Sequence, residues 1–353
     1  MSNSPGRPIA VRLCGGGAAA FAAARALADH GLRLQIEAGP MPPAKPHLLL
    51  NEPTVRLLDD LFGGDADLRR HAHVIRGRLV CWGRGGADLV EEPGLALAGT
   101  TLHRVLAARL CDDGSAPASD DITWTILARG RGGNDNEVIV MGDRVAIAAP
   151  ATLSAKADPS LCAVEAVAGG WLFLLPLGRD RAVVQAIVPQ RPHNPVQALD
   201  TLLAQSRLVA RLIAARTDAP EMFSCAPRLR PEPARPGWIA AGDAALAFDP
   251  LCGDGTGQAL RCGLLAGAII AAIAQGEPQG ACLAHYRDRL RRAMRAHLRA
   301  VVAFYDMAPC RDVWACEIAR AQQALDDIAG GDVSSAMAAR YRLERFSLVR
   351  AAA

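Results

Sequence analysis

Two glycine-rich turns, which lie far apart in the chain, constrain the fold more than any other feature of the sequence. The first is Cys14-Gly-Gly-Gly-Ala-Ala-Ala20, and the second lies within the apolar, glycine-punctuated stretch from Ile239 to Gly257. Each follows a short apolar run typical of a buried strand and precedes a run typical of an apolar helix. Both turns can serve one extended ligand only if the chain returns to the same sheet. The pair therefore predicts a domain built from discontinuous pieces.

The first turn fits the dinucleotide-binding pattern Gly15-x-Gly17-x-x-Ala20. Gly15 permits the tight turn, Gly17 lets a pyrophosphate approach the backbone, and Ala20 is small enough for helix and strand to pack closely. The helix start, which includes Ala18 and Ala19, offers free N–H groups to the phosphates. Glu37 ends the next strand, where its carboxylate accepts hydrogen bonds from ribose hydroxyls and disfavours a 2′-phosphate.

The second turn fits the flavin end of FAD, because FAD is more extended than NAD and often uses two such turns. Asp243, directly after Gly242, ends a strand and is placed to hydrogen-bond a ribityl chain. The helix from about Thr256 aims its first N–H groups at the pyrimidine edge, which is negatively charged in reduced flavin. The backbone is free to approach a flat ring at three glycines, Gly253, Gly255 and Gly257.

The stretch Gly242-Asp-Ala-Ala…Asp249-Pro-Leu-Cys-Gly-Asp-Gly-Thr-Gly-Gln-Ala-Leu260 closely resembles the signature of FAD-dependent monooxygenases of the p-hydroxybenzoate-hydroxylase fold. Arg104, within Leu102-His-Arg-Val-Leu106, is similar to that family's Arg-x-x-Leu after the middle strand. The resemblance spans residues 9 to 275. It implies FAD as cofactor and adds Arg104 and Pro250 to the residues expected around it.

Within this family the chain looks most like the tryptophan-halogenase-like branch. That branch includes small flavoproteins that mature tryptophylquinone enzymes, such as the lysine-ε-oxidase and glycine-oxidase maturation proteins. The chain is short, Gln258-Ala-Leu-Arg follows the glycine run, and the tail contains Phe304-Tyr305, Pro309 and Trp314. The resemblance implies an aromatic substrate, with a tryptophan of a precursor protein as the favoured one.

Two departures from the branch separate this chain from the halogenases. The halogenase Trp-x-Trp-x-Ile-Pro motif is absent, since the nearest stretch reads Val80-Cys-Trp-Gly-Arg-Gly85. Lysine occurs only at Lys45 and Lys156, neither of which matches the halogenase catalytic lysine. In addition, Ala148-Ala-Pro-Ala-Thr-Leu-Ser154 lacks the glycine that the family usually has in its middle turn. The first two departures argue against halogenation, whereas the altered turn bears on flavin geometry or on the handling of nicotinamide.

The resemblance and the pattern of elements together predict an α/β fold. We expect a discontinuous FAD-binding Rossmann-like domain of the GR2 type from residues 1–75, 101–160 and 225–280. An inserted antiparallel-sheet substrate domain is expected from 76–100 and 161–224, and a C-terminal helical region from 281–353. Patterning predicts helices at 18–30, 54–62, 101–110 and 196–215. It predicts strands at 9–14, 32–37, 74–82, 122–128, 138–141, 145–149, 162–167, 170–177 and 182–189, with a hairpin turn at 132–136.

The composition excludes several classes of protein. A net charge of +3 is too small to indicate nucleic-acid binding. The longest uncharged apolar run, from Cys262 to Gly276, is shorter than the roughly 20 residues of a membrane span. The ten cysteines form no CxxC pair and no regular framework, which favours a reducing compartment. With no signal-peptide pattern in the first residues, the sequence predicts a cytoplasmic protein without a membrane span.

The expected reaction is hydroxylation of an aromatic ring with O₂. The sequence contains one dinucleotide fingerprint, at residues 15–20, so we expect no separate domain for a nicotinamide cofactor. Electrons are therefore expected from NAD(P)H bound transiently or from a reductase. Asp254 and His47 are weak candidates for a catalytic base, although Asp254 is also suited to cap the following helix. Trp171 and Phe173 alternate on a predicted strand and fit either a substrate pocket or the core. The alternatives are a small-molecule aromatic or natural-product hydroxylase, a geranylgeranyl-reductase-like FAD oxidoreductase and a non-enzymatic flavin-binding accessory protein.

Overall fold

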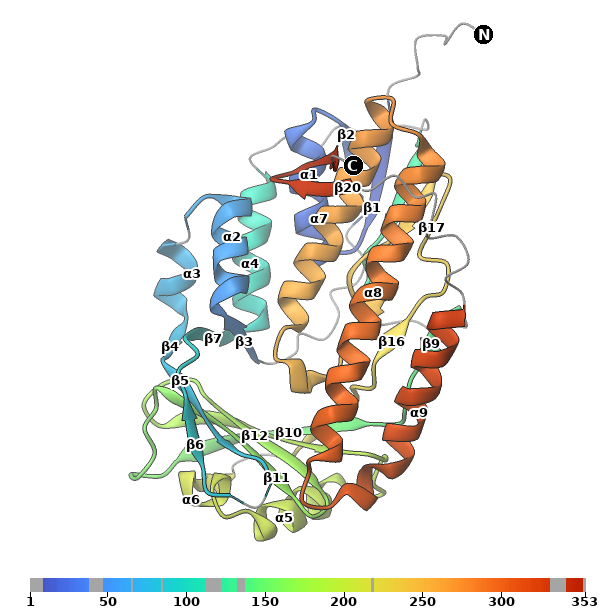
Figure 1. The fold of residues 1–353 in the computed structure, drawn as a ribbon. Coiled ribbons are helices and arrows are strands. Elements are labelled where there is room, and N and C mark those ends of the chain that lie inside the picture. The colour runs from blue at the N-terminus through green and yellow to red at the C-terminus, as the bar shows by residue number, and fades with distance from the viewer. Residues whose placement is uncertain are drawn as a thin grey trace, which may run out of the picture.

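The computed structural model describes residues 9–37, 47–64, 66–83, 85–111, 122–131, 137–216, 219–330 and 341–351. Its elements form an upper body of helices on a small, mostly parallel sheet and a lower body built on a large sheet (Figure 1). The long helix α8 (Gln279–Asp306) runs alongside both bodies (Figure 1).

The upper body is centred on a five-stranded sheet whose strands come from three separate parts of the chain. Its order is β17 (Ala234–Arg235), β18 (Trp238–Ala240), β8 (Trp124–Leu127), β1 (Ala10–Cys14) and β2 (Arg33–Glu37). β1 pairs in parallel with β2 and β8, and β18 pairs in parallel with β8. The return of β18 to the sheet confirms the predicted discontinuous arrangement.

Two apolar helices, α1 (Ala18–Asp29) and α7 (Gly255–Ala274), cross at very short range in the upper body. A Cβ atom at Gly263 would lie 2.0 Å from the carbonyl oxygen of Ala19, and one at Gly267 would lie 2.8 Å from that of Ala23. Small residues at the crossing therefore permit the contact. α7 has the length and hydropathy of a membrane span, but 67% of its most apolar window is buried inside the fold, as in the core helix of a globular protein.

The lower body is a large, mostly antiparallel sheet. Its order is β14 (Ile213–Arg216), β10 (Val145–Leu153), β13 (Arg181–Val188), β12 (Gly170–Pro176), β11 (Leu161–Val167), β5 (Gly77–Cys81) and β6 (Asp88–Val90), with β15 (Glu221–Ser224) also paired to β10. One face packs against α5 (Pro195–Gln205) and α6 (Val209–Leu212). The other packs against α8 and α9 (Arg311–Gly330). A sheet covered on both faces explains why its inner strands are apolar on both sides.

Smaller elements join the two bodies. A three-stranded sheet is formed by β3 (His47–Asn51), β7 (Gly94–Ala98) and β4 (His73–Ile75), and another by β19 (Leu246–Ala247), β16 (Arg228–Leu229) and β9 (Ile139–Val140). The helices α2 (Glu52–Phe62) and α4 (Gly99–Cys111) lie beside α1 in the upper body, and α3 (Ala66–His71) packs against α4 on its outer side (Figure 1). The second glycine-rich turn contains two short 3₁₀ helices, η1 (Gly242–Ala244) and η2 (Pro250–Cys252).

The predicted helix at 196–215 is wrong in its second half, where α5 ends, α6 forms one short turn and β14 follows. Buried Glu165 on β11 accounts for the break. Its carboxylate accepts hydrogen bonds from the Ser206 hydroxyl and from the backbone N–H groups of Arg207, Leu208 and Val209. These bonds occupy the donors that a continuous helix would point at preceding carbonyl groups, so they cap a new helix instead.

The predicted strand at 74–82 is two strands in two sheets. β4 pairs with β7, whereas β5 pairs with β11 and β6. The chain leaves the first sheet at Arg76, whose backbone N–H donates to the Ser160 carbonyl at 2.8 Å. Continuous apolar patterning cannot show such a change of partner.

Three further expectations differ from the structure. The predicted hairpin turn at 132–136 lies outside the described residues, but β8 and β9 belong to different sheets, so no hairpin joins them. β10 runs to Leu153 through the altered Ala148–Ser154 stretch, and it lies in the large sheet although 101–160 was assigned to the FAD-binding domain. The C-terminal region is not helical throughout, because β20 (Tyr341–Glu344) and β21 (Ser347–Arg350) form a hairpin.

Candidate functional site

The fold brings the two glycine-rich turns together. Gly242 has a left-handed φ of 61°, and a Cβ atom there would lie 2.6 Å from the Cβ of Ala19, in the first turn of α1. Because Cβ atoms do not approach so closely, only glycine fits at this position. The second turn is therefore packed against the start of α1, although the two segments are far apart in sequence.

The first turn has the geometry of an anion site. Gly15 has a φ of 135°, and a Cβ atom there would lie 2.2 Å from the Ala128 carbonyl oxygen. Gly17, the N-cap of α1, faces open space, with nothing within 4 Å of a Cβ position. No side chain caps α1, and its first turn carries no acidic residue. Its first N–H groups, at Ala18, Ala19 and Ala20, are thus without partners inside the helix and fit a pyrophosphate.

Glu37 lies beside this turn at the end of β2. The Gly15 N–H donates to the Glu37 carbonyl at 3.1 Å, and the Cys14 thiol donates to the Glu37 carboxylate at 3.0 Å. That hydrogen bond, followed by the charge of Arg129 at 3.7 Å, holds the pKa of Glu37 below its usual value. Burial, with the same contact, raises the pKa of Cys14 to about 11. The exposed carboxylate is therefore ionised beside a neutral thiol, as acceptance of ribose hydrogen bonds requires.

Arg129 was not predicted from the sequence. It follows β8, and the carboxyl end of β8 lies at the same sheet edge as those of β1 and β2. Its position directly after a parallel strand is the only sequence signal that marks it, because ligands collect at that edge of parallel sheets.

The second turn is held by its acidic residues. Asp243 in η1 forms an ion pair with Arg131 at 3.3 Å. The Asp254 carboxylate accepts a hydrogen bond from the Thr54 hydroxyl at 3.1 Å and pairs with Arg261, and it does not cap α7. A Cβ atom at Gly257 would lie 2.2 Å from that carboxylate. Glycine at 257 therefore makes room for the Asp254 contacts.

Two glycines of the second turn remain open to a ligand. Gly253 has a left-handed φ of 61°, and Gly255, the first residue of α7, has nothing within 4 Å of a Cβ position. Because α7 also lacks a side-chain cap, its first N–H groups, which include that of Thr256, are unpaired within the helix. This turn, like the first, fits a ligand with anionic or hydrogen-bond-accepting edges.

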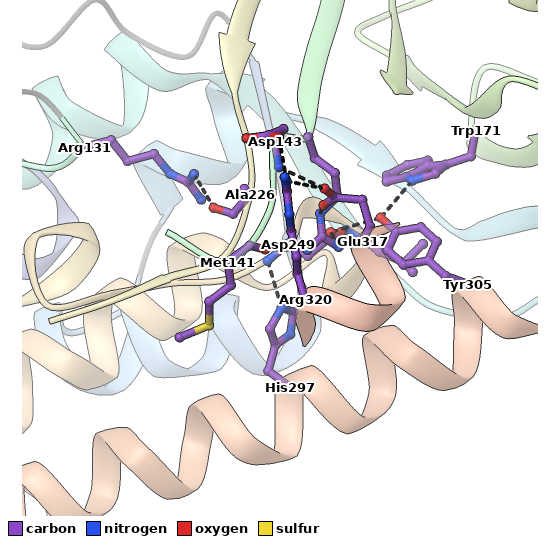
Figure 2. A network of polar contacts seen from close by, with 12 residues as sticks. Arg131, Met141, Asp143, Trp171, Ala226, Asp249, His297, Tyr305, Glu317 and Arg320 are labelled. Atoms are coloured by element: carbon purple, nitrogen blue, oxygen red, sulfur yellow. Dashed lines mark hydrogen bonds and ion pairs between the residues drawn. The ribbon is translucent and has the colours of Figure 1, made fainter. Parts of the chain in front are cut away.

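Asp249, the acidic residue before Pro250, is the centre of a buried polar cluster. Its carboxylate pairs with Arg144 at 2.8 Å, accepts from the Tyr305 hydroxyl at 2.9 Å and accepts from the Leu251 N–H at 2.8 Å. Figure 2 shows the C-terminal helices supplying His297, Tyr305 and Glu317 to this cluster. The Asp249 side chain is completely buried, so its contacts fix the Asp-Pro turn.

The partners of Asp249 were missed from the sequence. Arg144 is completely buried and also lies 2.8 Å from the Glu317 carboxylate of α9. Burial raises the pKa of Glu317, against the lowering effect of Arg144. His297 accepts the Asp249 N–H at 2.8 Å, and burial lowers the pKa of its ring to about 4, so the ring is neutral at pH 7. No periodicity or motif links these residues.

The remaining predicted residues border the two turns. His47 begins β3, is half-buried, and its Nδ1 atom has no hydrogen-bond partner among the described residues. Burial, and then Arg181, lowers its pKa, so a neutral ring can accept a proton. Arg104 on α4 is exposed and makes no hydrogen bond or ion pair with the described part of the chain. Its neighbour His103 reaches the first turn, since a Cβ at Gly16 would lie 3.2 Å from the His103 ring.

Comparison with known proteins gives fold-level likenesses over nearly the whole chain. The flavin-dependent halogenase CmlS matches with a TM-score of 0.81 and 15% identity, covering 98% of this chain and 84% of its own. QhpG, described as a peptidyl tryptophan dihydroxylase essential for tryptophylquinone cofactor biogenesis, matches with a TM-score of 0.75 and 22% identity, covering 98% and 86%. These likenesses confirm the predicted fold class.

Among curated proteins, the digeranylgeranylglycerophospholipid reductase 1 of Methanopyrus kandleri is 29% identical over 180 residues. The match covers 49% of this chain and 45% of that reductase, so the chain aligns with about half the length of this relative. No protein-family model matches the chain.

Proposed function

We propose that this chain, which has the fold shared by flavin-dependent halogenases and monooxygenases, binds FAD and hydroxylates an aromatic ring. The observation that carries the proposal is the contact between the two glycine-rich turns, at Gly242 and Ala19. Each turn begins a helix without a side-chain cap. Two uncapped helix starts in one site suit a ligand with a pyrophosphate at one end and an electron-accepting ring at the other.

In this proposal the chain's own residues bind and orient the cofactor. The N–H groups of residues 18–20 bind the pyrophosphate, the Glu37 carboxylate accepts from the adenosine ribose, and Asp243 with the start of α7 orients the flavin. Reduced FAD would supply two electrons with which one oxygen atom of O₂ enters the ring and the other leaves as water. The chain's part is to hold the ring and the substrate in place and to exclude bulk water.

The finer proposal is that the substrate ring is a tryptophan side chain within a polypeptide, as in the maturation of a tryptophylquinone cofactor. The likeness to QhpG supports this choice over a small aromatic molecule, together with the resemblance to the maturation flavoproteins. Electrons would come from NAD(P)H bound transiently or from a separate reductase. The free thiols among the described cysteines support a reducing location, for which we propose the cytoplasm.

A second candidate is an FAD-dependent reductase that saturates isoprenoid double bonds. The sequence match to the digeranylgeranylglycerophospholipid reductase of M. kandleri favours it. The two candidates differ in the use of oxygen. A monooxygenase adds an oxygen atom to its substrate, whereas a reductase adds hydrogen and does not consume O₂ for its product.

The first experiment separates FAD binding from folding with the variant Gly17→Asp. Gly17 has an extended backbone, faces open space and is the N-cap of α1, a position that aspartate favours. The variant should therefore fold at least as stably as the wild type, while its carboxylate repels the pyrophosphate. Purified wild-type protein should be yellow and release FAD on denaturation, and Gly17→Asp should be colourless. The matched control Gly280→Asp, at another open helix start, should stay yellow.

The second experiment tests the reaction. FAD-loaded protein is reduced and exposed to ¹⁸O₂ with a tryptophan-containing precursor protein, with free aromatic compounds or with an isoprenoid lipid, and each product is analysed by mass spectrometry. Incorporation of ¹⁸O into the precursor protein supports a polypeptide tryptophan as the substrate. Incorporation of ¹⁸O only into free aromatic compounds supports a small aromatic substrate instead. Saturation of the lipid without label, or a Gly17→Asp variant that keeps FAD, contradicts the proposed function.

A further inference from the structure

One row of side chains on the large sheet is only half-buried, in the middle of an otherwise buried surface. Along β12 every residue is buried except Phe173, and along β13 every residue is buried except Gln185 and the terminal Arg181. Phe173 and Gln185 lie directly opposite each other in the β12–β13 register. Two adjacent interior strands are thus incompletely covered at the same level and on the same face.

The residues on either side of this row are covered by different parts of the chain. Trp171, two residues before Phe173, packs with Tyr305 and Trp314 of the C-terminal helices. Leu175, two residues after it, packs with Ile75 and with Ala96 of the β3–β7–β4 sheet. Residues 171 and 175 are about 13 Å apart along a strand. Phe173 lies between these two clusters and packs partly against both, so the covering layer leaves part of its ring exposed. We call this opening between α8 and the small sheet the gap.

The second glycine-rich turn borders this gap. Leu251 of η2 is partly buried against the same cluster as Trp171. Arg78 of β5 lies beside Gly253, with its Nη2 atom 3.5 Å from the Cβ position. The register connects Phe173 through Val164 to Val80, two residues from Arg78 and on the same face. The gap and the proposed flavin turn are therefore neighbours.

The two half-buried side chains offer complementary chemistry. Phe173 presents an aromatic surface, on which a second ring packs in an offset or edge-to-face arrangement. The carboxamide of Gln185 has one acceptor and two donors. It makes no hydrogen bond with the part of the chain that the structure describes. In cross-strand pairs the two Cβ atoms are about 5 Å apart, so one planar ligand can contact both side chains.

We propose that Phe173 and Gln185 form the floor on which the substrate ring lies, and that they select an aromatic ring carrying an N–H or O–H donor, above all an indole. The ring packs on Phe173 and its N–H donates to the Gln185 Oε1 atom. This inference rests on the proposed function, because it places the ring beside the turn that would hold the flavin. In this proposal Phe173 and Gln185 determine which ring binds, and the second glycine-rich turn determines how far the flavin lies from that ring.

The test uses the FAD-loaded protein and three probes, which are N-acetyltryptophanamide, its 1-methyl derivative and N-acetylphenylalaninamide. Binding is followed by the change in visible flavin absorbance. Wild-type protein should bind the tryptophan probe most tightly. Gln185→Leu should weaken that probe about tenfold, as loss of one partner of a buried hydrogen bond does, and should leave the two probes without a ring donor unchanged. Phe173→Ala should weaken all three.

Gln197→Leu is the matched control, since Gln197 is an exposed glutamine on α5, on the opposite face of the sheet. It should bind every probe as the wild type does. The inference is overturned if FAD-loaded wild-type protein binds no probe, or if Gln185→Leu weakens the methylated and unmethylated indoles equally. Failure of the proposed function gives different results, because the wild type would then take up no FAD, or would saturate the isoprenoid lipid without incorporating ¹⁸O.

Discussion

The close approach of the two glycine-rich turns makes a quantitative prediction for Gly242→Ala. The added methyl group meets the Cβ of Ala19 at 2.6 Å, and the residue keeps a left-handed φ of 61°. The backbone strain costs about 1–2 kcal/mol, and the overpacking adds about 1–3 kcal/mol. We therefore expect the variant to lose about 2–5 kcal/mol of unfolding free energy.

Gly31→Ala separates the two contributions. Gly31 has a similar φ of 66°, but nothing lies within 4 Å of its Cβ position. This control should lose only the strain energy, about 1–2 kcal/mol. Urea unfolding of the FAD-free proteins gives the comparison, provided that the slopes of the transitions agree. FAD content should fall in Gly242→Ala and not in Gly31→Ala, because only the former separates the two turns.

A double-mutant cycle with Ala19→Gly identifies the clashing partner. Ala19→Gly removes the other methyl group and costs up to about 1 kcal/mol through helix propensity. In the Gly242→Ala background the same substitution should instead restore about 1–3 kcal/mol of unfolding free energy, because it removes the clash. The two substitutions should therefore have a favourable coupling energy. The reasoning is refuted if Gly242→Ala costs no more than Gly31→Ala, or if the coupling energy is zero.

Three further predictions concern charged and titratable residues. His297 has a pKa of about 4 in the fold against an ordinary value of 6.5, so the unfolded chain binds a proton first. Unfolding free energy measured from pH 7 to pH 4 should thus fall by about 3 kcal/mol more in wild type than in His297→Gln. Arg144→Met leaves Asp249 buried without its cation and removes the buried partner of Glu317, which keeps only Arg320 as a cation within the described residues, so it should cost about 3–5 kcal/mol in chemical denaturation. Glu37→Gln should weaken FAD binding about tenfold or more in a flavin fluorescence titration, with unchanged unfolding, because Glu37 is exposed.

The sequence predicts local features of the fold well. The strand, glycine turn and helix at residues 9–30 are recognisable because one short segment contains all the residues that make the turn. The discontinuous sheet was predicted for the same reason, since the second turn repeats this pattern. The expected cofactor residues on both turns are near one another in the structure, which Gly242 and Ala19 demonstrate by their contact.

Features that depend on distant partners were not predictable. Glu165 divides the expected helix at 196–215 by accepting hydrogen bonds from the hydroxyl of Ser206, 41 positions away, and from N–H groups 42 to 44 positions away. Arg144 meets Asp249 across 105 positions. Such contacts carry no periodicity, and a buried arginine looks like any surface arginine until its partners are known. Strand register is equally hidden, so the opposition of Phe173 and Gln185 appears only in the fold.

Two hydrogen bonds of Tyr305 join the proposed flavin turn to the strand that carries the proposed substrate floor. The indole N–H of Trp171 donates to the Tyr305 hydroxyl at 3.3 Å, and that hydroxyl donates to Asp249 at 2.9 Å. Trp171 flanks Phe173 on β12, and Asp249 precedes Pro250 in the turn. Tyr305 is completely buried and stacks on Trp314 at 4.0 Å, so its ring has little freedom. Tyr305 of α8 therefore contacts both the strand that carries the proposed substrate floor and the proposed flavin turn, and it helps to fix the spacing between them.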